Sequence, residues 1–240
     1  MRRTVVSAAV TALALLVAVP SAGAQTVDEI VAKIIEAKGG LDKLKGTTSV
    51  RMVGVATVQG TPVPIVAVSK RPNMVRNEME VAGQKMVQGY DGTTLWVAVP
   101  GMPAQELPPG PQTEMLKDNS QFDSVFLDWK ERGHKIDYKG KEADGGKEMH
   151  HLIVTPKSGP VVHYYIDAST GLETRTVMVI EDPAAKGQLE TRMSDYRNVD
   201  GRMIPFVITR LLNGSPAGDM KFEKVEFNVP LDDALFKMPK

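Results

Sequence analysis

The architecture follows from residues 49–99, which read SVRMVGVATVQGTPVPIVAVSKRPNMVRNEMEVAGQKMVQGYDGTTLWVAV. Over Ser49–Val58, apolar side chains fall on both faces of a two-residue period, so we expect a strand that is covered on both sides. Further strand-like runs follow at 63–68, 74–81, 85–90 and 94–99, separated by Gly, Pro and Asn. Short consecutive strands with tight turns predict an antiparallel meander.

The same pattern resumes in the second half of the chain. Strand-like runs occur at 135–141, 148–155, 161–167, 173–180, 188–197, 205–211 and 219–228. Turn residues at Asp167–Gly171 and Asp200-Gly201 predict hairpins between them. A long antiparallel sheet protects its edges and covers its inner face by curling. We therefore predict a mainly β fold, an incomplete antiparallel β-barrel made from a curved sheet of about eleven strands.

Helical patterns lie before and between the strands. Thr26 and Glu29 have capping-box spacing, and an apolar stripe follows until Gly39-Gly40. Leu41–Leu44 can add a short turn. The region 100–111 holds five prolines and is expected to be a surface loop, and Thr113–Glu131 is expected to be helical in two pieces. The N-terminal helix and this central helical lid would cover the mouth of the curved sheet.

The N-terminus has the three zones of a secretory signal peptide. Arg2 and Arg3 precede an apolar run over 5–19, and Ala22-Gly23-Ala24 follows. We expect residues 1–24 to be a signal peptide and residues 25–240 to be one lipid- or lipoprotein-binding domain, soluble in the periplasm. The chain has no cysteine, which excludes disulfides and a lipid-modified N-terminal Cys.

Composition narrows the range of partners. Without Arg2 and Arg3, 27 basic side chains face 29 acidic ones, a net charge of about −2. This balance gives no electrostatic reason to expect nucleic acid or anionic lipid head groups as partners. The 13 methionines suit an adaptable apolar surface, although they equally suit an ordinary core.

Two short motifs and their order carry a resemblance to a known family. Lys70-Arg71-Pro72-Asn73 precedes a strand, and Tyr90-Asp91-Gly92-Thr93-Thr94-Leu95-Trp96 leads into a Pro-Gly loop. This arrangement resembles the periplasmic outer-membrane lipoprotein carriers, the LolA/LolB-like family. The motif residues are Arg71, Pro72, Asn73, Asp91, Gly92 and Trp96. The resemblance implies an apolar interior that receives acyl chains.

The resemblance also implies a role for Arg71, because the arginine of this motif contacts the helical lid in the carriers. A guanidinium has five donors and can hold several lid acceptors at once, which suits a breakable latch. Alternatively, Arg71 is a solvated residue before a rigid proline turn. The strand after the motif departs from the carriers, since Met74-Val75-Arg76-Asn77 replaces their large aromatic residues.

The candidates for the ligand cavity are apolar residues of the strands and of the central region. They are Met74, Met79, Met86, Leu95, Val97, Leu116, Phe122 and Phe126. Plain core packing explains each of them as well, because periodicity alone does not distinguish a filled interior from a ligand cavity.

Enzyme motifs are missing from the sequence, so we expect no catalysis and no cofactor. His150 and His151 are neighbours on a predicted strand and therefore face opposite sides of the sheet. His163 could meet one of them across the sheet, but no third ligand is evident, and we expect no metal. Asp91, Asp123 and Asp167 are explained by turns and helix starts.

The function expected from these observations is lipoprotein transport, a chaperone-like sorting role for the outer membrane. A monomeric periplasmic carrier would bind the acyl chains of lipoproteins or other lipids. It would exchange them with an inner-membrane donor and an outer-membrane acceptor. The alternative is a non-enzymatic lipid-sensing or protein-binding module, similar to the regulators of envelope stress. A purely structural protein with a filled interior is a third possibility.

Overall fold

The computed structural model describes residues 25–58, 60–180 and 186–239, and the expected signal peptide, residues 1–24, lies outside them. The helices are α1 (Val27–Ala37), α2 (Leu41–Lys45), α3 (Pro111–Asp118) and the 3-10 helix η1 (Asp233–Phe236). The strands are β1 (Ser49–Val58), β2 (Thr61–Lys70), β3 (Met74–Val81), β4 (Gln84–Tyr90), β5 (Leu95–Ala98), β6 (Gln105–Glu106), β7 (Lys135–Asp144), β8 (Lys147–Thr155), β9 (Val162–Asp167), β10 (Glu173–Ile180), β11 (Gly187–Val199), β12 (Arg202–Leu212) and β13 (Ser215–Phe227).

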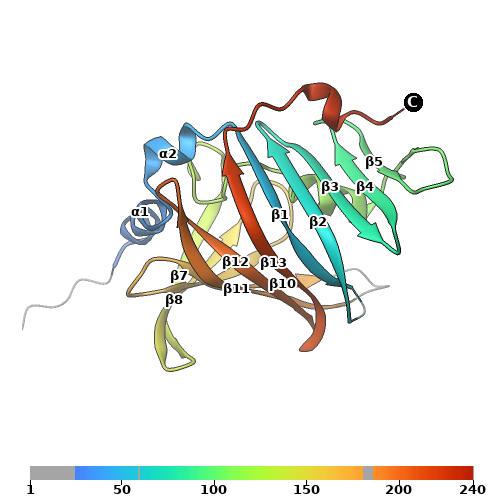
Figure 1. Ribbon diagram of the computed structural model, residues 1–240. Helices are drawn as coiled ribbons and strands as arrows, with labels where there is room; N and C mark the ends of the chain where they lie inside the picture. Colours follow the sequence, from blue (N-terminus) through green and yellow to red (C-terminus); the bar gives the residue numbers. More distant parts are fainter. Residues whose placement is uncertain (1–24, 59, 181–185, 240) are drawn as a thin grey trace, which may run out of the picture.

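All thirteen strands in the described part of the chain form one sheet (Figure 1). Its order is β6-β5-β4-β3-β2-β1-β13-β12-β11-β10-β9-β8-β7, and each neighbouring pair is antiparallel. Two meanders, β1–β6 and β7–β13, are therefore joined where β1 pairs with β13. The expected mainly β fold with one open, curved antiparallel sheet is confirmed.

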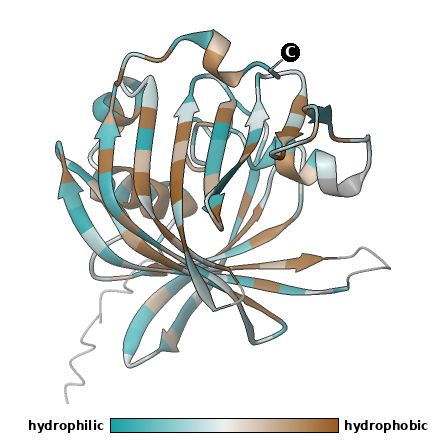
Figure 2. Ribbon diagram, turned by 45° about the vertical axis from the view of Figure 1, so that its right-hand side comes forward, coloured by the Kyte–Doolittle hydropathy of each residue, from teal (hydrophilic) through white to brown (hydrophobic). Residues whose placement is uncertain are grey.

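The sheet is curved, and bulges contribute to its bending. The register between β1 and β13 shifts at Val53/Gly54, and Asp195 in β11 has a φ of 51°. Gly54 is required at this shift, because a Cβ there would lie 2.2 Å from the backbone oxygen of Lys221. Bulges of this kind bend a strand and increase its twist. Figure 2 shows the resulting curvature, with apolar and polar residues interspersed along the strands.

Helix α1 packs on the inner face of the β7–β9 end of the sheet. Its predicted capping box is present, with Thr26 and Glu29 each accepting the other's backbone N–H. The apolar stripe is buried against the strands and against Phe126. The shared core consists of Ile30, Val31, Ile34, Phe126, Ile136, Leu152, Val154 and Ile166. Burying each large side chain contributes about 1.5–3 kcal/mol, so this stripe fixes the helix on the sheet.

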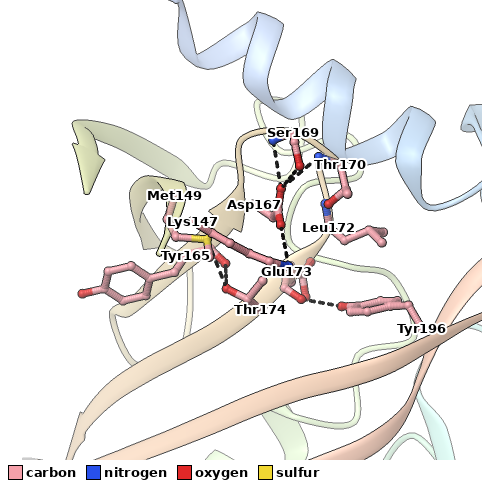
Figure 3. A network of polar contacts seen from close by, with 10 residues as sticks. All are labelled: Lys147, Met149, Tyr165, Asp167, Ser169, Thr170, Leu172, Glu173, Thr174 and Tyr196. Atoms are coloured by element: carbon pink, nitrogen blue, oxygen red, sulfur yellow. Dashed lines mark hydrogen bonds and ion pairs between the residues drawn. The ribbon is translucent and has the colours of Figure 1, made fainter. Parts of the chain in front are cut away.

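The turn between β9 and β10 forms a second contact with α1 (Figure 3). The Asp167 carboxylate accepts hydrogen bonds from the backbone N–H groups of Ser169 at 2.9 Å and Thr170 at 3.0 Å. This shapes the turn so that the Ala168 carbonyl accepts a hydrogen bond from Lys33 of α1. A turn residue thereby positions a helix that is distant in the sequence.

The opposite, outer face of β4 and β5 is covered by η1. The Trp96 indole is fully buried, and its N–H donates to the Phe236 carbonyl at 2.8 Å. Gly89 lies opposite Trp96 on β4, where a Cβ would come within 2.2 Å of the indole ring. Trp96 of the sequence motif therefore serves the outer packing of the sheet.

Two expectations for the middle of the chain are wrong. Thr113–Glu131 is not helical throughout, because α3 ends at Asp118 and residues 119–133 form turns. The Ser120 hydroxyl donates to the Leu116 carbonyl at 2.8 Å, and Arg132 donates to the Ser124 carbonyl at 2.7 Å. These bonds satisfy backbone acceptors without a helix.

The second correction concerns the proline-rich loop. Gln105–Glu106 forms the short strand β6, which pairs with β5 between the prolines of the loop. Two proline-free residues are enough for edge pairing, because an edge strand needs partners on one side only. The sheet therefore has thirteen described strands instead of about eleven.

None of the helices within residues 25–58, 60–180 and 186–239 combines the length and the apolarity needed to cross a membrane.

Candidate functional site

A cavity of about 620 Å³ lies between the inner face of the sheet and α3. Strands β3, β4 and β5 form one wall, strands β9 to β12 form the other, and α3 with the residues after it lies between them. The lining residues are Val75, Asn77, Gln88, Gly89, Tyr90, Leu95, Met115, Leu116, Asn119, Ser120, Val162, Tyr164, Thr176, Met178, Leu189, Thr191 and Arg210. Its volume is typical of pockets for small organic ligands.

Two further cavities adjoin this first cavity. The second cavity, of about 330 Å³, shares Val75, Asn119 and Ser120 with it, and reaches under α2 to β1, β12 and β13. The third cavity, of about 320 Å³, shares Asn119 and the β9–β10 wall. Residues 111–133, called here the central segment, thus lie across the inner face of the sheet and divide its hollow into adjoining parts.

One arginine ties the central segment to the N-terminal part of the chain. The Arg71 guanidinium donates to the carbonyls of Thr47 at 2.6 Å and Leu44 at 2.9 Å, and it forms an ion pair with Asp123. It also lies 4.9 Å from the ring centroid of Phe122. Four groups from two parts of the chain, residues 44–47 and 122–123, therefore contact the Arg71 guanidinium beside the second cavity.

The other motif residues form the turns around this arginine. The Pro72 carbonyl accepts the Phe122 N–H at 3.2 Å, which adds a backbone link to the central segment. The Asp91 carboxylate accepts the N–H groups of Thr93 and Thr94, and Asn73 lies beside Gly92, whose φ is 95°. These turns orient β3 and β5 on either side of β4.

The residues predicted from the sequence to line the ligand cavity occupy different positions in the structure. Leu95 and Leu116 line the first cavity, and Phe122 lines the second. Met79, Met86 and Val97 share the inner face of their strands with Val75, Tyr90 and Leu95, as the register requires. Phe126 is buried in the core beneath α1. Met74 lies on the outer side of β3, since it neighbours the inward-facing Val75.

Arg210 is a cavity residue that the sequence reasoning missed. It lies on β12 opposite Thr191 of β11, and it shares the inner face with Phe206 and Ile208. The signal was present in the sequence, because the two-residue period places this arginine on an apolar face. The side chain reaches solvent within the hollow, yet partial burial between the walls lowers its pKa.

Polar side chains cluster separately on the outer face of β7–β10. His151 Nε2 lies 2.9 Å from His163 Nδ1, and His151 Nδ1 lies 2.6 Å from a Glu142 oxygen. His151 also stacks on Tyr165 with ring centroids 4.6 Å apart. His150 points to the other face, as expected for its neighbour, and contacts Tyr138 at 2.9 Å. In the described ranges, no group of three His, Cys, Asp or Glu side chains could hold a metal ion.

Comparison with known proteins finds solved structures of similar fold. No protein-family model matches the sequence, and the comparison with curated proteins finds no match. Among solved structures, a DUF1329 family protein from Desulfovibrio piger is similar with a TM-score of 0.62 and 14% identity, over 88% of this chain and 97% of that one.

Two other solved structures share this fold. A LolA superfamily protein from Nitrosomonas europaea has a TM-score of 0.59 and 15% identity, over 89% of this chain and 98% of that one. An outer membrane lipoprotein-sorting protein domain from Vibrio parahaemolyticus has a TM-score of 0.57 and 10% identity, over 87% of this chain and 94% of that one. At these identities the likeness establishes a shared fold, which is the LolA-like fold.

Proposed function

We propose that this chain is a periplasmic carrier that holds acyl chains in the hollow beneath the central segment. Residues 1–24 would direct export, and residues 25–240 would act as one domain. The main support for this proposal is that adjoining cavities lie beneath the central segment, which Arg71 binds to the N-terminal part of the chain. The LolA-like fold supports it by analogy, since fold alone does not determine function.

Capture of an acyl chain would be driven by the hydrophobic effect. Each methylene that leaves water contributes about 0.8 kcal/mol, so a chain of ordinary length gains enough free energy to bind without any other energy source. Met115, Leu116, Met178 and Leu189 offer flexible apolar contacts inside the first cavity. Thioether side chains adapt to chains of varied shape.

Release would require the central segment to move away from the sheet. The polar links that must break include the ion pairs Arg71–Asp123, Lys45–Asp128 and Lys130–Asp28, and the hydrogen bond from Phe122 to Pro72. A membrane-bound donor or acceptor could compete for the Asp123 carboxylate or the Arg71 guanidinium. The proposed cycle therefore uses a monomer, an inner-membrane donor and an outer-membrane acceptor, with no cofactor and no catalytic step.

The test is native mass spectrometry of the protein expressed with its leader and recovered from a bacterial periplasm, followed by lipid extraction. We expect bound phospholipid or acylated peptide, and altered retention in an Arg71→Leu variant. Arg51→Leu is the matched control, because Arg51 pairs with Glu226 on the outer face of the sheet at 2.9 Å. If the protein carries no ligand and takes up no fluorescent fatty acid, the carrier proposal fails, and a protein-binding module becomes the better hypothesis.

A further inference from the structure

Arg210 is the one charged side chain among the described residues that line the first cavity. It projects from the inner face of β12, and its neighbours across the strands are Thr191 on β11 and Gly218 on β13. Gly218 has no side chain that could pair with the guanidinium. The opposite wall presents the amide side chains of Asn77 and Gln88 to the same cavity.

The charge of Arg210 is not balanced by another group in the described part of the chain. Burial is the cause of its lowered pKa, and neither a hydrogen bond nor a neighbouring carboxylate offsets that effect. Glu190 is next to Thr191 in sequence but takes part in ion pairs with Arg192 at 2.5 Å and Arg175 at 3.9 Å, on the other face of the sheet. Arg210 is exposed to solvent within the hollow, so a ligand that enters the first cavity can reach its guanidinium.

The charged residues of the second cavity make a useful contrast. Lys38 pairs with Glu173, Asp123 pairs with Arg71, and Arg202 donates to the Thr47 hydroxyl at 2.9 Å. Each of these groups is already used within the fold. Among the described charged residues that line the first and second cavities, Arg210 is the one without a hydrogen-bond or ion-pair partner in the fold.

We propose that Arg210 binds the anionic head group of an amphiphilic cargo whose acyl chain occupies the first cavity. The planar guanidinium fork matches the paired oxygens of a carboxylate or a phosphate. Met178 and Leu189 from β10 and β11, together with Leu116 from α3, supply apolar surface in the same cavity. Asn77 and Gln88 offer further donors to oxyanions on the facing wall.

This inference rests on the proposed carrier function and narrows its cargo. The diacylglyceryl and N-acyl groups of a lipoprotein carry no charge, whereas fatty acids and phospholipids present an oxyanion next to their chains. An arginine inside the cavity therefore favours anionic lipid over the lipoprotein anchor. The two anion sources, carboxylate and phosphate, differ in charge and shape and can be tested separately.

The experiment is a fluorescent-lipid displacement assay at mildly alkaline pH with the protein recovered from the periplasm. The probes are oleate, its methyl ester, and a lysophosphatidic acid with the same chain. We expect one or both anions to bind about tenfold or more tightly than the ester, a factor in line with a charge-assisted hydrogen bond. The anion with the larger advantage identifies the head group.

The variants decide whether Arg210 causes that advantage. Arg210→Gln should lose the preference for the anion while it keeps the affinity for the ester, and Arg210→Lys should restore part of the preference. Arg192→Gln is the matched control, because Arg192 is an exposed outer arginine paired with Glu190. Thermal unfolding of each variant shows whether the fold is intact.

The possible outcomes distinguish failure of the anion site at Arg210 from failure of the carrier function. Equal affinity for acid and ester, unchanged in Arg210→Gln, overturns the anion site and leaves the carrier standing. If inorganic phosphate displaces the lysophosphatidic acid but an acyl chain adds no affinity, the site binds an anion without a lipid, which also overturns the proposal. If no probe binds, both the anion site and the carrier function are rejected.

Discussion

The Asp123 carboxylate pairs with the Arg71 guanidinium, which at the same time donates to the carbonyls of Leu44 and Thr47. The ion pair joins residues 52 positions apart in the sequence. Both side chains are partly exposed, at 27% and 29%, so water and salt weaken the pair. This is the balance that a latch needs, because a bond that water can reach opens more readily than a buried one.

Loss of the latch should loosen the central segment more than it destabilises the fold. Asp123→Asn removes one partly screened ion pair, so we expect a loss of about 0.5–1 kcal/mol in the free energy of unfolding. Amide exchange in residues 119–133 should accelerate, as should the release of a fluorescent fatty acid. The measurement is hydrogen exchange with mass spectrometry, with Glu226→Gln as the control on the outer face. Equal effects of the two variants on the central segment would contradict the latch.

Gly89→Ala should disturb the outer face of the sheet. A Cβ at this position would lie 2.2 Å from the Trp96 ring, so the indole must shift away from Phe236. Overpacking of this kind costs about 1–3 kcal/mol, and the lost hydrogen bond adds to it. Urea unfolding and tryptophan fluorescence measure both effects. Gly110→Ala is the control, since nothing lies within 4 Å of its Cβ position, and it should leave both readouts unchanged.

Asp167→Asn should weaken the turn that supports α1 (Figure 3). Burial by itself raises the pKa of Asp167, but hydrogen bonds from Ser169 and Thr170 and the Lys147 ammonium outweigh it and hold the pKa well below 3.8. A depressed carboxyl pKa stabilises the folded state above its unfolded value, and the contribution is lost as pH falls through the folded value. We expect the variant to lose about 1–3 kcal/mol near neutral pH. The difference from wild type should shrink in acid, and urea unfolding at several pH values checks this.

Mild acid should also destabilise the protein through its histidines. Burial lowers the pKa of His134, His150 and His163, and His151 lowers that of His163 further. The unfolded chain therefore takes up protons as pH falls through 6.5 while the folded chain resists them, so stability declines below this pH. The decline should level off only below the folded pKa values. Urea unfolding of wild type and His163→Asn at about pH 7.5 and pH 5.5 measures it, and an equally steep decline in the variant would exclude His163 as a contributor.

Local pattern was sufficient to predict most of the strands but not the way in which the sheet is assembled. Ser49–Val58 and Met74–Val81 begin and end as predicted, because alternation and turn residues are properties of neighbours in sequence. The pairing of β1 with β13 depends on residues at the two ends of the domain, and no local pattern encodes it. The same holds for β6, whose two residues become a strand only because β5 offers a free edge.

The residues of the candidate site could be predicted where alternation along a strand decides which face of the sheet a side chain occupies. Leu95 lies on the inner face that the register defines, whereas Met74 belongs to the other parity of β3. The turns after Asp118 could not be foreseen, because side-chain bonds such as that from Ser120 to Leu116 replace the helix there. Arg210 was overlooked because a polar residue on an apolar face was not treated as a signal in its own right.

The seam between β1 and β13 constrains the order of events during folding. Met52 pairs with Val225, so the centre of the sheet forms only once the last strand is available to pair with the first. Until then β1 has a long unpaired edge, which is a template for aggregation. Contacts so distant in sequence also slow the folding reaction. If the chain is exported as we propose, β1 needs shielding until translocation has delivered β13. The proposed carrier of acyl chains would then depend on another protein during its own folding.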